Sequence, residues 1–197
     1  MGRPSNRAQR RGEIVEGLQA VMALQGYEAA SVAEVARAAG LATGLVHYHF
    51  KSKQEILLAL IERLGAAIED RLAPCLAKAA TPRAKLEALL DVHLARGQGD
   101  PAALACWVAI GAEAIRQPEV REAYGAVLRR RIDLMSSLLR EALAAAGQPT
   151  RGAKAGAAGL SAAIEGYFQL AAAAPDLVPR GSAARSAKRM LSGLLSS

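Results

Sequence analysis

The chain has 197 residues, of which 52% are hydrophobic and only 4% aromatic, and its formal net charge is +7. That hydrophobic content can bury a core and excludes a disordered chain. Abundant alanine, leucine and arginine with few aromatic side chains favours packed helices over sheets, so we expect an all-α protein of about nine helices.

This sequence lacks the features that several classes of protein require. No segment has the ~18 uninterrupted apolar residues of a membrane span, and the basic start runs into Glu13 and Glu16 without a signal peptide's apolar stretch, so we expect a cytoplasmic protein. Cys75 and Cys106 lie far apart with no histidine at ligand spacing, so we expect no metal site and no disulfide framework. No enzyme motif for a nucleophile, metal or phosphate occurs, and we expect neither enzyme activity nor a cofactor.

The N-terminal region has the start and stop signals of three successive helices. Apolar residues at helical spacing predict a first helix over about residues 6–25, ended by Gly26. Ser31 followed by Glu34 is a capping box, which predicts the start of a short second helix that Gly40 ends. Only two residues later a third helix begins, so the connection is a tight turn.

The third predicted helix, residues 43–50, has Thr43 as its N-cap. A short helix, a glycine turn and a second short helix are the arrangement that places the second helix in the major groove of DNA. Val46 and Phe50 are four residues apart and should face the core. A solvated surface is the alternative for the opposite face, and for His49, at the boundary, we favour packing over DNA contact.

The outer face of this helix offers hydrogen-bond donors and one apolar group. His47 and Tyr48 can donate to phosphates or base edges, and Leu45 can contact a thymine methyl group. Arginines precede or open the first helix, whereas Lys51 and Lys53 lie at the start of the fourth. Net charge alone is weak evidence, but two basic clusters that bracket such a helix are what phosphate contacts require. The predicted DNA-binding residues are Arg3, Arg7, Arg10, Ser31, Thr43, Gly44, Leu45, His47, Tyr48 and Lys53.

The sequence of the remaining chain predicts six further helices. Thr81 and Asp100 each precede a proline, which is the pattern of an N-cap followed by the first helical residue. Gly97 and Gly99 mark the end of the helix that follows Thr81. Residues 177–182 read like a thrombin-cleavage linker, but we interpret them as a native loop because a helix-forming segment follows. The predicted helices span about residues 53–74, 82–97, 101–117, 119–147, 149–174 and 182–195.

Residues 31–57 resemble the TetR family of transcriptional regulators. The resemblance rests on the turn of Ala39, Gly40 and Leu41, on Gly44 and Phe50, and on Ser52, Lys53, Glu55 and Leu57. It implies that residues 43–50 read the major groove and that Lys53 anchors a phosphate. Residues 1–53 would then be the DNA-binding domain, with its helix-turn-helix motif at about 31–50, and residues 54–197 a ligand-binding and dimerisation domain. Where the family usually has a phosphate-contacting tyrosine, this chain has His47.

The second domain resembles the BetI-like branch of that family around residues 105–109, 117–118 and 164–167. That branch responds to choline-type ligands, and a quaternary ammonium group is held by an aromatic cage. Glu113, or alternatively Glu165, would supply the negative charge opposite the ammonium group. We favour ordinary packing for these aromatic residues over a choline cage. The candidate ligand-pocket residues are Trp107, Glu113, Tyr124, Tyr167 and Phe168.

Small and apolar residues in the last two predicted helices, together with the resemblance, predict a homodimer interface. An intramolecular core is the alternative, but two-fold dimers match palindromic operators. The candidate interface residues are Gly156, Gly159, Met190, Leu191 and Leu194. We expect a repressor that binds double-stranded operator DNA and is released from it by an unidentified small-molecule effector. A ligand-independent architectural DNA binder is the alternative, and it would not need a large apolar second domain.

Overall fold

The computed structural model describes residues 6–94 and 100–196, and this part of the chain forms nine α-helices, one short 3-10 helix and no strand. The all-α prediction is therefore confirmed. Contacts between Cα atoms divide the chain into two compact units. Unit 1 comprises Met1–Leu64 and Pro101–Tyr124, and unit 2 comprises Gly65–Asp100 and Gly125–Ser197. None of the described helices is both long enough and apolar enough to cross a membrane.

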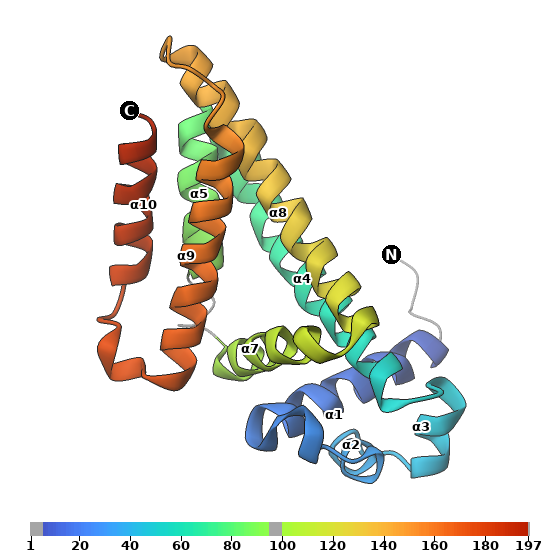
Figure 1. Cartoon of the computed structure of the whole chain (residues 1–197). Helices are drawn as coiled ribbons and strands as arrows, with labels where there is room; N and C mark the ends of the chain where they lie inside the picture. Colours follow the sequence, from blue (N-terminus) through green and yellow to red (C-terminus); the bar gives the residue numbers. More distant parts are fainter. Residues whose placement is uncertain (1–5, 95–99, 197) are drawn as a thin grey trace. The chain divides into compact units, whose positions relative to one another are not determined.

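Unit 1 is built around α1 (Asn6–Ala29), on which α2 (Val32–Ala38), α3 (Thr43–His49) and α7 (Pro101–Arg116) pack (Figure 1). It also contains the first part of α4 (Lys53–Lys78) and the start of α8 (Pro118–Ala145). Apolar side chains from these helices are almost fully buried, because each helix presents one apolar face to the others. The most deeply buried include Ile14, Leu18, Val35, Val46, Leu57 and Ile110.

The start of α2 forms as the sequence predicts. The Ser31 Oγ accepts a hydrogen bond from the Glu34 backbone N–H at 3.2 Å, and the Glu34 carboxylate accepts one from the Ser31 N–H at 2.9 Å. These bonds to Ser31 hold the pKa of Glu34 below its usual range. Ser31 is therefore a capping residue in this fold.

One predicted helix end and one predicted cap differ from the structure. The N-cap of α3 is Ala42, not Thr43, because the Ala42 carbonyl accepts from the N–H groups of the first turn and Thr43 is already helical. Helix α4 continues past Pro74 to Lys78, since a proline's fixed φ is itself helical and only one backbone hydrogen bond is lost. The regular first part of α1 ends at Gly26 as predicted, because Gly26 has the non-helical φ 77° and ψ 173°, and one further turn, residues 27–29, follows it within the bounds of α1.

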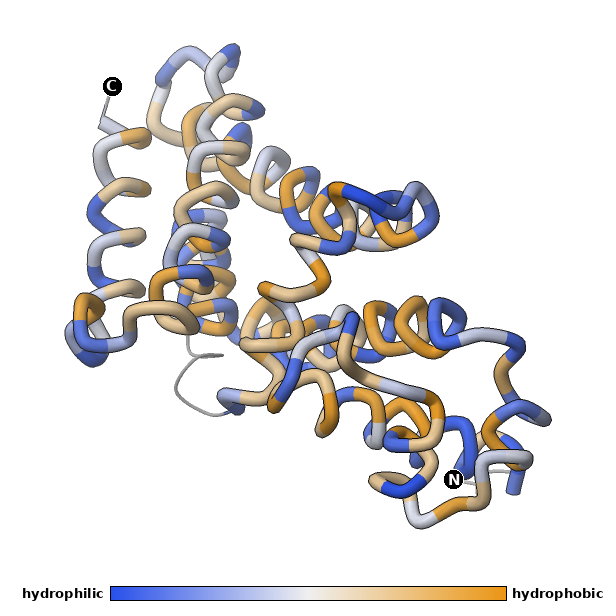
Figure 2. Tube along the Cα trace, turned by 60° about the horizontal axis from the view of Figure 1, so that its bottom comes forward, coloured by the Kyte–Doolittle hydropathy of each residue, from blue (hydrophilic) through white to orange (hydrophobic). Residues whose placement is uncertain are grey.

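Unit 2 contains the remainder of α4 and α8, together with α5 (Pro82–Leu94), α9 (Ala153–Ala173), the 3-10 helix η1 (Pro175–Leu177) and α10 (Ser182–Leu194). Helices α5, α9 and α10 pack against one another (Figure 1). The hydrophobic residues of α10 face α9 and its hydrophilic residues face away (Figure 2), which buries Ala187 and Leu191. The predicted helix end at Gly97 and Gly99 lies outside the described residues.

The two compact units and the two predicted domains divide the chain at different residues. Helix α7 belongs to unit 1 because it packs on α1, although the sequence assigns it to the second domain. The functional division into residues 1–53 and 54–197 stays a prediction.

Candidate DNA-binding surface and effector domain

Helix α3 separates its side chains into a buried face and an exposed face. Val46 and Phe50 are 1% and 2% exposed and belong to the core, as their spacing predicts. Thr43, Gly44 and His47 are exposed, and Tyr48 has 77% of its surface accessible, which is unusual for an aromatic residue in a folded chain. A large amphipathic side chain held in solvent is available to a partner.

Gly44 has no neighbour that requires a glycine. No atom lies within 4 Å of the position that a Cβ would occupy. A glycine in a helix costs stability relative to alanine, so a glycine that faces open space is not explained by packing inside the chain. It leaves room for another molecule to approach the backbone of α3.

His49 is 7% exposed, so it packs as the sequence analysis favoured. Its ring stacks edge-on with Tyr48, with 5.0 Å between ring centroids. The Nδ1 atom is buried and has no hydrogen-bond partner among the described residues. His49 thus supports α3 from the inner side and does not face the same way as His47.

The N-terminal arginines have different environments. Arg3 lies outside the described residues. Arg7 is exposed, and no hydrogen bond or ion pair engages its side chain within the described residues. Arg10 pairs with Glu13 at 2.8 Å. The Arg11 guanidinium donates to the His49 carbonyl and lies 3.9 Å from the Phe50 ring centroid, so it ties α1 to the end of α3.

The two lysines near the start of α4 also differ. Lys51 is exposed, and its ammonium group makes no hydrogen bond or ion pair in the described part of the chain. Lys53 is half-buried, and its Nζ donates to the carbonyl oxygens of Tyr27 at 2.9 Å and Glu28 at 3.3 Å. Lys51 was not among the predicted site residues, although its position directly after α3 was a usable signal.

Three of the predicted ligand-pocket residues lie in unit 1. Trp107 is 2% exposed and packs against Tyr124, with 4.9 Å between ring centroids at an interplanar angle of 48°. Glu113 is 5% exposed, and its carboxylate accepts from Arg116 at 2.8 Å and from Gln117 at 2.7 Å. Both carboxylate oxygens of Glu113 are therefore engaged within the chain.

The other two predicted pocket residues, Tyr167 and Phe168, lie in unit 2 on α9. Phe168 is 3% exposed and belongs to the core of that unit. The alternative counter-charge, Glu165, accepts a hydrogen bond from Arg131 at 2.7 Å, and the same guanidinium donates to the Ser161 hydroxyl. This network joins α8 to α9 and satisfies a buried arginine.

Comparison with known proteins identifies the family. Residues 14–60 match the family described as bacterial regulatory proteins, tetR family, and residues 82–196 match the BetI-type transcriptional repressor, C-terminal. The chain is 35% identical over 159 residues to the HTH-type transcriptional regulator BetI of Rhizobium meliloti, which covers 81% of this chain and 76% of that protein. The chain belongs to the TetR family of transcriptional regulators. The range of the BetI-type match includes residues 177–182, and their interpretation as a native loop stays a prediction.

Solved structures of other regulators share the fold. A putative transcriptional regulator from Pseudomonas aeruginosa PAO1 superposes with a TM-score of 0.86 at 19% identity, covering 98% of this chain and 94% of that one. A putative transcriptional regulator from Saccharomonospora viridis in complex with choline superposes with a TM-score of 0.80 at 22% identity, covering 96% of each chain.

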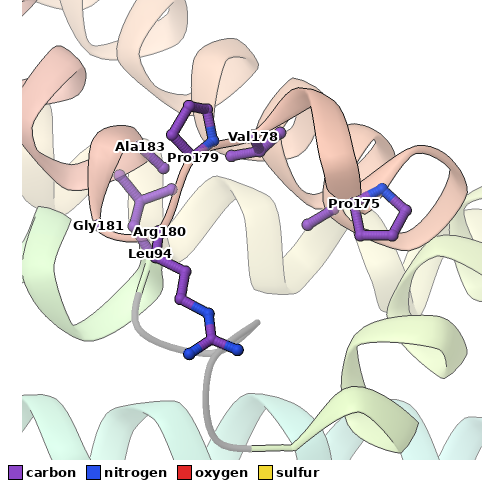
Figure 3. A pocket seen from close by; sticks show the side chains of 8 residues that line it. Leu94, Pro175, Val178, Pro179, Arg180, Gly181 and Ala183 are labelled. Carbon is purple, nitrogen blue, oxygen red and sulfur yellow. The ribbon is translucent and has the colours of Figure 1, made fainter.

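Within this TetR-family chain, unit 2 contains a pocket of about 460 Å³ beside the ends of α5 and α9. Figure 3 shows the Arg180 side chain extending away from the side chains of Val178 and Pro179, with its guanidinium at the far end. Among the residues that the structure describes, none that lines the pocket is aromatic or acidic, and none forms a hydrogen bond or ion pair with Arg180. The sequence does not predict this site, because its walls come from separate segments that only the fold brings together at η1 and the loop after it. The lining residues are Leu94, Ala171, Pro175, Val178, Pro179, Arg180, Gly181 and Ala183.

All of the predicted dimer residues except Leu191 line a groove between α9 and α10, also in unit 2. Met190 is 48% exposed and Gly159 faces open space at the edge of this groove. Gly156 is buried inside the chain, where an added Cβ would lie 3.2 Å from a methyl group of Leu194. Leu191 is fully buried. Met190 and Gly159 thus remain accessible, whereas Gly156 and Leu191 hold α10 on α9.

Proposed function

We propose that the protein is an effector-released repressor that binds a palindromic operator as a homodimer and reads the major groove with α3. The observation that carries the proposal is the outer face of α3, where Tyr48 is exposed and Gly44 has open space in front of it. Lys51 follows α3 directly and Arg7 lies at the start of α1; neither side chain is paired with another described residue, and such cations are what phosphate contacts need.

Selection of binding sites from a random DNA library tests this proposal, because the selection itself yields the operator sequence. The wild-type protein should enrich a palindromic sequence. Tyr48→Ala should enrich a different or degenerate sequence at one position of each half-site, because a base-reading side chain has been removed. Failure to enrich any sequence, or an identical preference for the variant, contradicts the assignment.

We also propose that unit 2 holds the effector and that the Arg180 pocket is its first candidate site. Its volume is within the range of small-molecule sites, and the Arg180 guanidinium beside an otherwise apolar described lining suits an organic anion. The aromatic residues predicted for a choline cage remain the competing proposal. The predicted aromatic residues are Trp107 and Tyr124, which lie in unit 1, and Tyr167 and Phe168, which lie in unit 2, and Glu113 in unit 1 is the predicted counter-charge.

Two probes with opposite charges separate these sites. Octanoate should raise the melting temperature of the wild-type protein but not of Arg180→Gln, since a ligand of the native state stabilises it. Choline should raise the melting temperature of both proteins if the aromatic cage is the site. A stabilising probe counts as an effector only if it also weakens operator binding, because release requires different affinities for the two forms of the protein.

The homodimer would form through the exposed part of the groove between α9 and α10. Small residues such as Gly159 allow a second copy of these helices to approach closely, and the exposed Met190 supplies apolar contact. An effector would act by changing the separation of the two recognition helices, which on DNA are about one duplex turn apart, ~34–36 Å.

A further inference from the structure

A series of side-chain hydrogen bonds joins α7 to the first turn of α4, and all of its residues belong to unit 1. Glu113 of α7 is almost fully buried, and its Oε2 accepts a hydrogen bond from the Gln117 Nε2 at 2.7 Å. The Gln117 Oε1 accepts in turn from the Gln54 Nε2 at 3.2 Å. The same Gln54 nitrogen also donates to the exposed Glu119 carboxylate at 3.2 Å. We call Glu113, Gln117 and Gln54 the polar bridge.

The charge of Glu113 determines the direction in which both amides of the polar bridge point. A carboxylate only accepts hydrogen bonds, so Gln117 presents its NH₂ group to Glu113 and its carbonyl oxygen to Gln54. Gln54 must then present its own NH₂ group, which has two hydrogens and can donate to Gln117 and Glu119 together. Reversing either amide would place two acceptors against each other. The polar bridge is therefore satisfied in one orientation.

Glu113 is also fixed from the side of α1. Burial of a carboxylate is costly unless donors surround it. The Arg116 Nη2 donates to the second Glu113 oxygen, Oε1, at 2.8 Å and to the Glu28 Oε1 at 3.0 Å. Glu28 lies in the last turn of α1, so Glu113 is connected to both α1 and α4. Both of its carboxylate oxygens are occupied by partners from unit 1.

The polar bridge joins two junctions between helices. Gln54 is the second residue of α4, and only residues 50–52 separate α4 from the end of α3. Gln117 is the single residue between the end of α7 and the start of α8. Side chains that hold the first turn of α4 to the α7–α8 junction also limit where the end of α3 can lie, because three residues span only a short distance.

We infer that Glu113 is a positioning residue, which through Gln117 and Gln54 holds α3 in the orientation that binds DNA. Helices α4 and α8 both continue from unit 1 into unit 2, so the polar bridge also ties together the first turns of these two helices. The inference rests on the proposed DNA-binding function. It assigns Glu113 to the support of α3 and not to the charge opposite a cationic ligand.

The test exchanges the charge between the two ends of the polar bridge with variants that preserve side-chain size. All are made in a Glu119→Gln background, because an amide there can either accept from or donate to position 54. Glu113→Gln and Gln54→Glu should each lower the melting temperature by about 3 to 10 °C, since each places two donors or two acceptors against each other. Each should also weaken binding to the operator selected from the random library by about tenfold, at a temperature at which every variant is folded.

The double variant, Glu113→Gln with Gln54→Glu, should recover most of both losses. Gln117 can then reverse its amide, so that it donates to the carboxylate at position 54 and accepts from the amide at position 113. Ser161→Ala is the stability control, because Ser161 is buried in unit 2 and accepts a hydrogen bond from the Arg131 guanidinium. This variant should lower the melting temperature and leave operator affinity unchanged.

Two results would overturn the inference. One is a double variant in which the two losses of melting temperature simply add, because the direction of the polar bridge would then be irrelevant. The other is operator affinity that stays at the level of the background protein in both single variants. If the wild-type protein enriches no DNA sequence, the proposed function fails, and the melting temperatures alone then decide whether Glu113 holds the start of α4.

Discussion

At the scale of single residues, Gly44 is where folding and DNA binding have opposite requirements. Its Cβ position is open, so alanine fits without a clash. Alanine is favoured over glycine in a helix by up to ~1 kcal/mol, so Gly44→Ala should raise the melting temperature by a few degrees. The added methyl group would occupy the space through which DNA approaches, so the same variant should bind operator DNA at least tenfold more weakly.

Gly166→Ala is the control for Gly44→Ala. Gly166 lies in α9, and no atom is within 4 Å of its Cβ position either. This variant should gain stability and keep its DNA affinity. Operator affinity that is unchanged in Gly44→Ala would remove Gly44 from the DNA-binding surface.

Because of Tyr27, the stability of the protein should fall at alkaline pH. Burial raises the pKa of Tyr27 to about 12, and the Glu113 and Glu28 carboxylates add to the shift. The unfolded chain loses this proton near pH 10, whereas the native state retains it, so the stabilisation is complete below pH 10 and is lost as pH rises towards 12. Urea unfolding across this range should show a steeper loss of stability in the wild-type protein than in Tyr27→Phe. Equal slopes would show that Tyr27 titrates normally in the folded chain.

At the scale of the elements, the start of α2 was predictable from neighbouring residues, whereas long-range contacts were not. Ser31 and Glu34 form their capping box because both partners lie within four residues. The partner of Lys53 depends on the kink at Gly26, which turns the carbonyls of Tyr27 and Glu28 towards α4. Sequence spacing cannot locate a contact between residues that the fold alone brings together.

The same distinction applies to the candidate sites. The inner and outer faces of α3 follow from helical periodicity, so Val46 was correctly placed in the core and Tyr48 on the surface. The Arg180 pocket could not be predicted, because it needs the ends of α5 and α9 beside the loop that follows η1.

Helix α10 provides the element-scale test of dimerisation. Met190→Glu would place a charge in the proposed apolar interface, where burial without a partner is costly, so the variant should elute and scatter light as a monomer. Leu170→Glu is the matched control, because Leu170 is 44% exposed on α9 but lies outside the groove. If Met190→Glu is still a dimer, or if Leu170→Glu also abolishes the dimer, the interface lies on another surface.

At the scale of the whole molecule, the proposed function depends on two copies of α3 acting together. One helix-turn-helix contacts too few base pairs for operator specificity, whereas a two-fold dimer reads two half-sites on one face of the duplex. The net charge of +7 supports association with DNA of any sequence, so specificity must come from the geometry of the dimer.

Changing the spacing between the half-sites of a selected operator tests that geometry. Five added base pairs turn one half-site by about half a turn, since the duplex repeats every 10–10.5 base pairs, and a dimer can then no longer reach both half-sites. Wild-type affinity, measured by fluorescence anisotropy, should fall at least tenfold. The affinity of Met190→Glu should be low on both operators and insensitive to the insertion, because a monomer reads one half-site at a time. Equal wild-type affinity for the two operators would mean that the recognition helices bind independently, and the coupled release of both by an effector would then lose its structural basis.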